Sequence, residues 1–304
     1  MYMVMKHKNF KNYFFKFKLI FVLILSFNVS TKSIFANSIQ SSGQKYSNDF
    51  SKSIYKNWAD WNTTGPHPKA AKIKDGKLII TVTSKMLDTH TNRTGRFELE
   101  KRNISKSLAV YQKFKVRSHP DNLINDRVLI SQIKQMDRGG SSQPQAMVSL
   151  DRAPSCTIYS YKKEFKDFPT FRKEQYLSNY KKYQINEPVF WRAHKKKSWF
   201  FAEFRKTEPA NKEWKTLNDA KWHTVEMDVY PHSKNGYCII KIDGKVYISL
   251  KNAPTRSLGG GKFRYDARIG IYRDTVKHSH TVEYDDWEIE TYKPETGMRI
   301  VLDN

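Results

Sequence analysis

The chain has 304 residues, a formal net charge of +24 at pH 7 and only two cysteines. This length is enough for one large all-β domain or two small ones. The sequence shows no zinc-site spacing of His, Cys and carboxylates, no serine-nucleophile motif and no phosphate-cradling glycine loop. The sequence therefore argues against a zinc enzyme, a serine hydrolase and a nucleotide-binding protein of the usual motif types. The positive charge predicts an anionic partner.

Residues 1–36 have the pattern of a signal peptide. Lysines at positions 6, 8, 11, 16 and 18 precede a short apolar run over 19–27, and a small residue, Ala36, marks the expected cleavage site. The run is too short to span a bilayer comfortably, although an uncleaved N-terminal anchor is the alternative. We expect a secreted protein, extracellular or periplasmic, that begins near Asn37 and has no stable membrane insertion.

Removal of residues 1–36 takes away six lysines and no acids, which leaves a charge of +18. A basic protein outside the cytoplasm meets three kinds of polyanion there: acidic polysaccharide, envelope polymers and extracellular DNA. We expect an anionic polysaccharide as the partner and a monomeric protein. No nucleic-acid partner and no cofactor are expected. A structural calcium ion is compatible with the sequence, but no residues indicate a site.

Downstream of a lead-in at 37–56, strand patterns recur with turn signals between them. Asp243-Gly244, between two such stretches, is a strong signal for a two-residue hairpin. Convincing amphipathic helices are scarce. We predict that 57–304 form a single all-β, concanavalin-like jelly-roll sandwich of two curved antiparallel sheets. The expected strands lie at 77–83, 109–116, 128–135, 147–150, 224–230, 237–242, 245–250, 262–273 and 281–292.

The segment at about 161–206 departs from this pattern because it combines aromatic residues with 13 Lys and Arg against 5 Asp and Glu. We interpret it as an insertion of long loops that forms one wall of a groove. The alternative is a solvated insertion whose aromatic residues pack on the sandwich. Basic residues interleaved with aromatic ones also describe a channel for single-stranded nucleic acid, but the predicted secretion argues against that interpretation.

The stretch 262–273 separates its side chains by parity, because successive strand residues point to opposite faces. One face is apolar and includes Tyr265. The other face carries a row of polar residues that we interpret as the floor of a groove for an anionic chain; an ordinary solvated face is the alternative. Its members are Lys262, Arg264, Asp266, Arg268 and Tyr272.

Two further stretches offer polar rows of the same kind. Arg96, Glu98, Glu100 and Arg102 share one face of the first, and Gln132 and Lys134 lie side by side on the second. If these strands are neighbours of 262–273 in one sheet, they form a concave face rich in charge.

The order of three short motifs resembles that of the jelly-roll polysaccharide lyases, the group that includes alginate, glucuronan and heparin-lyase-like enzymes. The motifs are Arg96-Phe-Glu-Leu99, Gln132-Ile-Lys134 and Gly270-Ile-Tyr272, and the likeness runs from about Trp58 to Tyr292. The resemblance implies β-elimination on a uronic-acid polysaccharide. That reaction needs neutralisation of the uronate carboxylate, a base for the C5 proton and an acid for the leaving O4.

The resemblance assigns the carboxylate to Gln132 and Arg96, with Glu98 orienting Arg96 or the sugar. At the position of the family's histidine base stands Lys134, which acts either as the base or as a fixed charge for the carboxylate. Crowding by Arg96 and by Arg268 would lower the pKa of Lys134, because like charges disfavour the charged form.

Two of the family's other catalytic positions are also altered. Asp266 occupies the first tyrosine position and Arg268 the lysine position, whereas the last tyrosine is present as Tyr272. We favour Tyr272 as the proton carrier and hold Tyr265 in reserve, since strict alternation directs Tyr265 into the core unless a bulge re-aims it. Expected substrate-binding residues are Glu98, Arg93, Lys262, Arg264, Arg268 and His194.

Two other functions stay open. The altered positions are also compatible with a lectin-like module that binds acidic glycans without catalysis. Residues Glu283 to Glu288 fit the Glu-x-Asp-x-x-Glu pattern of laminarinase-like glycoside hydrolases, whose acid and nucleophile are two carboxylates. The identity of the uronate, endo or exo action, and pairing of Cys156 with Cys238 are not readable from the sequence.

Overall fold

The computed structural model describes much of the chain from Gly43 onward. The predicted signal peptide lies outside the described residues. No helix in the described part of the chain is long and apolar enough to cross a membrane. The described ranges are 43–51, 61–64, 68–86, 94–122, 128–137, 140–151, 153–161, 190–195, 199–205, 217–256, 264–274 and 277–301.

The first of two antiparallel sheets contains eight strands. β1 (Lys45–Asn48) is a side branch that pairs with residues 287–290 of β16 (His280–Tyr292), so part of the predicted lead-in belongs to the sandwich. The spatial order of the others is β14 (Lys245–Ala253), β13 (Gly236–Ile242), β12 (His223–Tyr230), β6 (Ala109–Ser118), β16 (His280–Tyr292), β4 (Lys77–Val82) and β3 (Ala71–Lys74).

The second sheet also contains eight antiparallel strands. The described secondary structure also includes the short 3-10 helices η1 (Pro68–Ala70) and η4 (Pro294–Thr296). The spatial order is β10 (Phe190–Lys195), β11 (Trp199–Arg205), β9 (Ser155–Tyr161), β8 (Gly140–Ser149), β7 (Val128–Asp137), β15 (Arg264–Asp274), β5 (Thr94–Ser105) and β2 (Trp61–Thr64).

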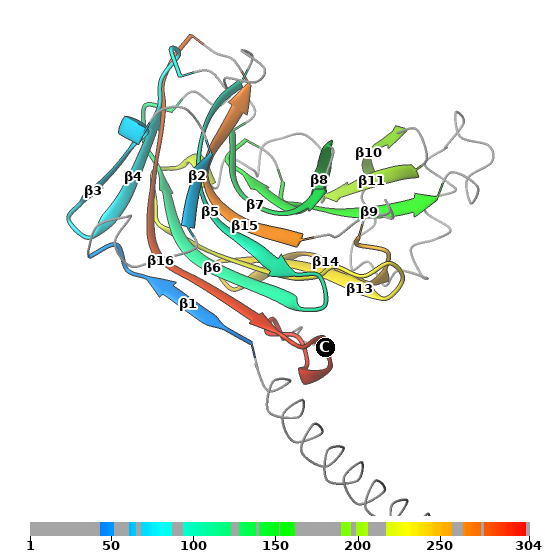
Figure 1. Ribbon diagram of the computed structural model, residues 1–304. Coiled ribbons are helices and arrows are strands. Elements are labelled where there is room, and N and C mark those ends of the chain that lie inside the picture. The colour runs from blue at the N-terminus through cyan, green and yellow to red at the C-terminus, as the bar shows by residue number, and fades with distance from the viewer. Residues whose placement is uncertain are drawn as a thin grey trace, which may run out of the picture. The chain divides into compact units, whose positions relative to one another are not determined.

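The predicted fold class, an all-β sandwich of two curved antiparallel sheets, is confirmed. Figure 1 shows long strands such as β5, β6, β15 and β16 bending along their length in two layers. The loop interpretation of 161–206 is wrong for two stretches, because β10 and β11 pair with each other and β11 pairs with β9. The high density of charge conceals strand alternation there; the intervening 162–189 lie outside the described residues.

Alternating side chains from both sheets build the larger of two hydrophobic clusters among the described residues. Half-buried and buried residues alternate strictly along β4. On β15, every other residue from Tyr265 to Ile271 is fully buried in this cluster. The Asp243-Gly244 turn has positive φ at both residues (49° and 80°), as the favoured two-residue hairpin turn requires. The hairpin prediction is therefore confirmed by the β13–β14 pairing.

A disulfide joins the two sheets. Cys156 on β9 and Cys238 on β13 are bonded, with their Cα atoms 6.0 Å apart. The bridge answers a question that the sequence left open, because the distance between the two cysteines depends on how the sheets stack.

Tyr284 supplies hydrogen bonds to the backbone at an irregularity in the second sheet. The β7–β15 register shifts between Ile269 and Tyr272. The Tyr284 hydroxyl reaches across from β16, lies 2.8 Å from the carbonyl of Gly270 and 2.9 Å from that of Ile130, and accepts the Gly270 N–H at 3.2 Å. Gly270 has φ +145°, and a Cβ there would lie 2.3 Å from the Phe97 carbonyl oxygen, so only glycine fits.

Replacing the buried hydroxyl tests this role. Tyr284→Phe leaves backbone groups of Gly270 and Ile130 without their shared partner, so we expect the free energy of unfolding to fall by about 1–3 kcal/mol. Chemical denaturation measures the change. Tyr230→Phe, at a half-buried tyrosine on the first sheet, is the control and should change stability by less than about 0.5 kcal/mol. Equal effects of the two substitutions would contradict the role of Tyr284.

Candidate active site

The three predicted polar rows lie on three adjacent strands, β7, β15 and β5. Arg268 is the cross-strand partner of Gln132 on one side and of Glu100 on the other. Two residues further along β7, on the same face, Lys134 lies opposite Asp266. Toward the other end of β5, Arg96 lies opposite Tyr272. The prediction that these stretches are neighbours in one sheet is confirmed.

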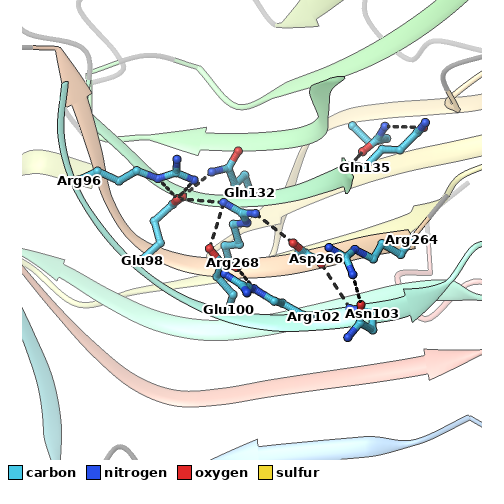
Figure 2. Close-up of polar contacts among 11 residues, drawn as sticks. Arg96, Glu98, Glu100, Arg102, Asn103, Gln132, Gln135, Arg264, Asp266 and Arg268 are labelled. Carbon is cyan, nitrogen blue, oxygen red and sulfur yellow. Dashed lines mark hydrogen bonds and ion pairs between the residues drawn. The ribbon is translucent and has the colours of Figure 1, made fainter. Parts of the chain in front are cut away.

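Arg268 is enclosed by three carboxylates. Its guanidinium nitrogens lie 3.3 Å from Glu98, 3.2 Å from Glu100 and 3.0 Å from Asp266, and the residue is 1% exposed. Figure 2 shows the guanidinium at the centre of these contacts. We predicted that Arg268 binds substrate directly; its ion pairs with three carboxylates of the protein argue against that role.

Glu98 connects the candidate carboxylate-binding residues. It accepts hydrogen bonds from Arg96 (Nε to Oε2, 2.6 Å) and from the amide of Gln132, and it faces Arg268 (Figure 2). Burial alone would raise the pKa of the Glu98 carboxyl. The charges of Arg96 and Arg268 and the hydrogen bonds from Gln132 and Arg96 outweigh burial and lower that pKa. Glu98 is therefore an anion that fixes both side chains.

Arg96 and Tyr272 form the more accessible end of the row. Both side chains are half-buried, and the Arg96 guanidinium carbon lies 5.1 Å from the centroid of the Tyr272 ring. This distance is within the range of a cation–π contact. Tyr272 thus lies on the polar face beside the proposed carboxylate-binding arginine, as the parity of β15 predicted.

Lys134 differs from the other cations of the row. Within the described residues it has no hydrogen-bond or ion-pair partner. Burial, followed by the charges of Arg268 and Arg96, lowers the pKa of its ammonium from 10.5 to about 8, although Glu98 and Glu100 oppose the shift. The predicted direction of this shift is confirmed, but burial contributes more than the crowding that the sequence suggested.

The chain beside Lys134 is locally irregular. Lys134 faces Pro144 on β8, which has no N–H to donate, and the register shifts on both sides of this pair. The side chain of Gln145 compensates by accepting the Gln135 N–H at 2.7 Å. An uncharged strand therefore borders Lys134 on this side.

Tyr265 is unsuitable as the reserve proton carrier. Its side chain is 0% exposed and belongs to the hydrophobic core. A register shift against β5 follows it, between Tyr265 and Ala267, but does not turn its ring toward the polar face. Strict alternation was the correct expectation, and the reserve role of Tyr265 is wrong.

The other predicted substrate ligands are placed in part. Arg264 is exposed on β15 and donates to the Asn103 side chain at 2.7 Å. Arg93 and Lys262 lie outside the described residues. His194 is described only as part of the β10 backbone, and its side chain lies outside what the structure describes.

The sequence did not reveal the partners of the buried charges. The sequence places Glu100 and Asp266 in their polar rows, and Asp266 is also a departure from the lyase pattern. That both of them enclose Arg268 depends on the pairing register of β5 and β15. Gln112, from the first sheet, was also missed; its amide donates to Ser131 at 2.6 Å beneath this cluster.

The carboxylates of the hydrolase-like motif lie on the other sheet. Glu283 and Glu288 belong to β16, where they pair with Arg117 at 2.6 Å and with Lys45 at 3.2 Å. The motif is thus separated from the polar rows, and its carboxylates are used in ion pairs. Among the described residues, no group of three His, Cys, Asp or Glu side chains is placed to hold a metal ion.

No family model and no curated protein matches the sequence. The chain is similar to the structure of endo-β-1,4-glucuronan lyase from the fungus Trichoderma reesei, with 15% identity, a TM-score of 0.47, and 80% of this chain and 94% of that one covered. For alginate lyase A1-II′ of polysaccharide lyase family 7, the identity is 9% and the TM-score 0.47, with 77% and 95% covered.

Another similar structure is that of SCLam, a non-specific endo-β-1,3(4)-glucanase of family GH16. Its identity is 12% and its TM-score 0.41, with 83% of this chain and 92% of that one covered. Structures of the predicted lyase group are thus among the matches, but so is a glucanase.

The lowered pKa of Lys134 predicts a gain in stability when the amine is removed. A folded-state pKa of about 8, below the ordinary 10.5, means that the folded protein carries a penalty below pH 8, which fades as the pH rises toward 10.5. Lys134→Met should raise the free energy of unfolding at pH 7 by up to about 3 kcal/mol, and by less at pH 9.5. Denaturation at both pH values measures this, and lower stability at pH 7 would contradict the shift.

Proposed function

We propose that the protein is a secreted polysaccharide lyase, released by signal-peptide cleavage near Ala36, that cleaves an anionic uronic-acid polysaccharide by β-elimination. Lys134 carries the proposal: an amine with a pKa of about 8 and no ion-pair partner among the described residues is a suitable general base near neutral pH. It stands in the same row of β7 as Gln132, and the row of β5 that holds Arg96 lies two strands away, on the far side of β15. These two residues supply donors for a uronate carboxylate.

The elimination follows from these positions. Hydrogen bonds from Gln132 and Arg96 neutralise the uronate carboxylate, which makes the C5 proton acidic. Neutral Lys134 takes that proton, the C5–H electron pair forms the C4–C5 double bond, and the bond from C4 to the leaving O4 breaks. Tyr272 gives its phenolic proton to O4. The products are one shortened chain and one chain that ends in an unsaturated uronate.

The different roles proposed for Arg268 and Arg96 agree with the contacts of each side chain. The guanidinium of Arg268 is engaged by three carboxylates of the protein, so we do not assign it to the binding of a polyanion. Arg96 is half-buried and pairs with Glu98 at 2.6 Å. The high net charge of the chain supplies the remaining long-range attraction for an anionic substrate.

A panel of polymers tests the proposed activity. Protein that begins at Asn37 is incubated with glucuronan, alginate, heparin, heparan and hyaluronan, and the ultraviolet absorbance of the unsaturated uronate is followed. An increase with one polymer supports the proposal and identifies the uronate. No increase with any polymer, together with salt-sensitive retention on an acidic-glycan column, would contradict it in favour of a non-catalytic glycan-binding module.

Activity should rise with pH through about 8. Lys134 accepts a proton only when neutral, and its ammonium is lost as the pH passes its pKa of about 8. Lys134→Met should lower kcat by about 10²–10⁴-fold at every pH. Lys134→Arg keeps a positive charge that cannot deprotonate; equal inactivity of Lys134→Arg identifies a base, whereas substantial activity would show that Lys134 serves only as a fixed charge.

Single substitutions separate the other roles. Gln132→Ala or Arg96→Ala should lower kcat/KM by about 10²–10³-fold, because each removes a donor to the carboxylate on which charge develops. Tyr272→Phe should lower kcat by a similar or larger factor through loss of the acid. Circular dichroism and denaturation confirm that each variant is folded. Full activity of all three folded variants would refute the assignment of the site.

A further inference from the structure

Among the described residues, the charged groups on the polar face around Lys134 form a set of three arginines and three carboxylates without it. Arg96, Arg102 and Arg268 each face a carboxylate, and the three carboxylates belong to Glu98, Glu100 and Asp266. An ammonium at Lys134 would therefore add an uncompensated charge to a largely buried cluster. Burial of an unpaired charge is costly, so this arrangement favours the neutral amine.

Arg268 is the member of this set best placed to act on Lys134. It lies on β15 diagonally across from Lys134, one pair away on the same face of adjacent strands, a relation that brings residues to within about 7–8 Å. Its main chain is also held: the Arg268 carbonyl accepts the Ser131 hydroxyl at 2.8 Å. A cation that is fixed at both ends acts on its neighbour at constant distance.

The other charges that face Lys134 come from two strands. On β15 these are Asp266 and Arg268, and on β5, one strand beyond, they are Arg96, Glu98 and Glu100. Described residues of β8 beside Lys134, such as Pro144 and Gln145, are uncharged. Burial raises the pKa of Asp266, while the charge of Arg268 and the hydrogen bond from it oppose that shift.

We propose that Arg268 is a positioning residue whose fixed charge, rather than any contact with substrate, disfavours the ammonium form of Lys134 and so makes the proton-accepting amine available nearer to neutral pH. The inference rests on the proposed function for its catalytic meaning, but its electrostatic content concerns this chain alone. The effect is consistent with the lowering of the Lys134 pKa by Arg268. The charges of Glu100 and Glu98 raise the pKa of Lys134 instead. Glu98 also accepts the hydrogen bonds that fix Arg96 and Gln132.

The test measures the titration of the Lys134 amine directly. The protein is labelled with acetic anhydride over a range of pH, and mass spectrometry quantifies acetylation of the peptide that contains Lys134. Arg268→Gln should move the titration midpoint upward by about one unit. Arg268→Lys, which keeps the charge, should leave it nearly unchanged, and Glu100→Gln should move it downward. Arg117→Gln, which breaks an ion pair on the other sheet, is the matched control and should move nothing.

The outcomes separate this inference from the proposed function. An unchanged midpoint in folded Arg268→Gln, or an equal shift in Arg268→Lys, overturns the role of Arg268 even if the wild type cleaves polymer. If Arg268→Gln does not fold, Glu100→Gln keeps the test, and a midpoint that fails to fall overturns the proposal. Where cleavage is observed, the pH midpoint of kcat should shift in parallel with the labelling. Absence of cleavage refutes the lyase assignment but leaves the labelling result in force.

Discussion

Arg268 is surrounded by the carboxylates of Glu98, Glu100 and Asp266 at the centre of the second sheet, and this buried ion cluster organises the polar face. Removing water from four charged groups is expensive unless each is paired, so the cluster constrains the register of β5 and β15. Glu98 extends the constraint to Arg96 and Gln132. The side chains proposed to bind a uronate carboxylate are thus held in place before any substrate arrives, which is the condition for electrostatic catalysis.

The same cluster explains why Lys134 differs from an ordinary surface lysine. Lys134 is half-buried and lies at the edge of a set in which the described arginines and carboxylates already pair with one another. On its other side lies β8, which carries no charged residue. These surroundings disfavour its ammonium form. A lysine can therefore occupy the position at which the resemblance led us to expect a histidine, because the folded environment brings its pKa toward the range in which histidine titrates.

Features that depend on local periodicity could be predicted from the sequence, whereas features that depend on pairing could not. Parity alone placed Tyr265 in the core and Tyr272 on the polar face, and the Asp243-Gly244 turn was identified by its residues. The neutralisation of Arg268 depends on which acids lie opposite it in neighbouring strands. β10 and β11 were missed because a basic, aromatic-rich segment hides alternation, and the bond between Cys156 and Cys238 depends on sheet stacking.

Cleavage of the C4–O4 bond of the polysaccharide by elimination is tested most directly by the mass of the products. Oligosaccharides released from a susceptible polyuronate are analysed by mass spectrometry, with Lys134→Met as the blank. The account predicts products whose new non-reducing ends are one water lighter than hydrolysis products, because elimination leaves a C4–C5 double bond. Products of full hydrolytic mass, formed equally well by Lys134→Met, would contradict it and would redirect attention to carboxylates such as Glu283 and Glu288.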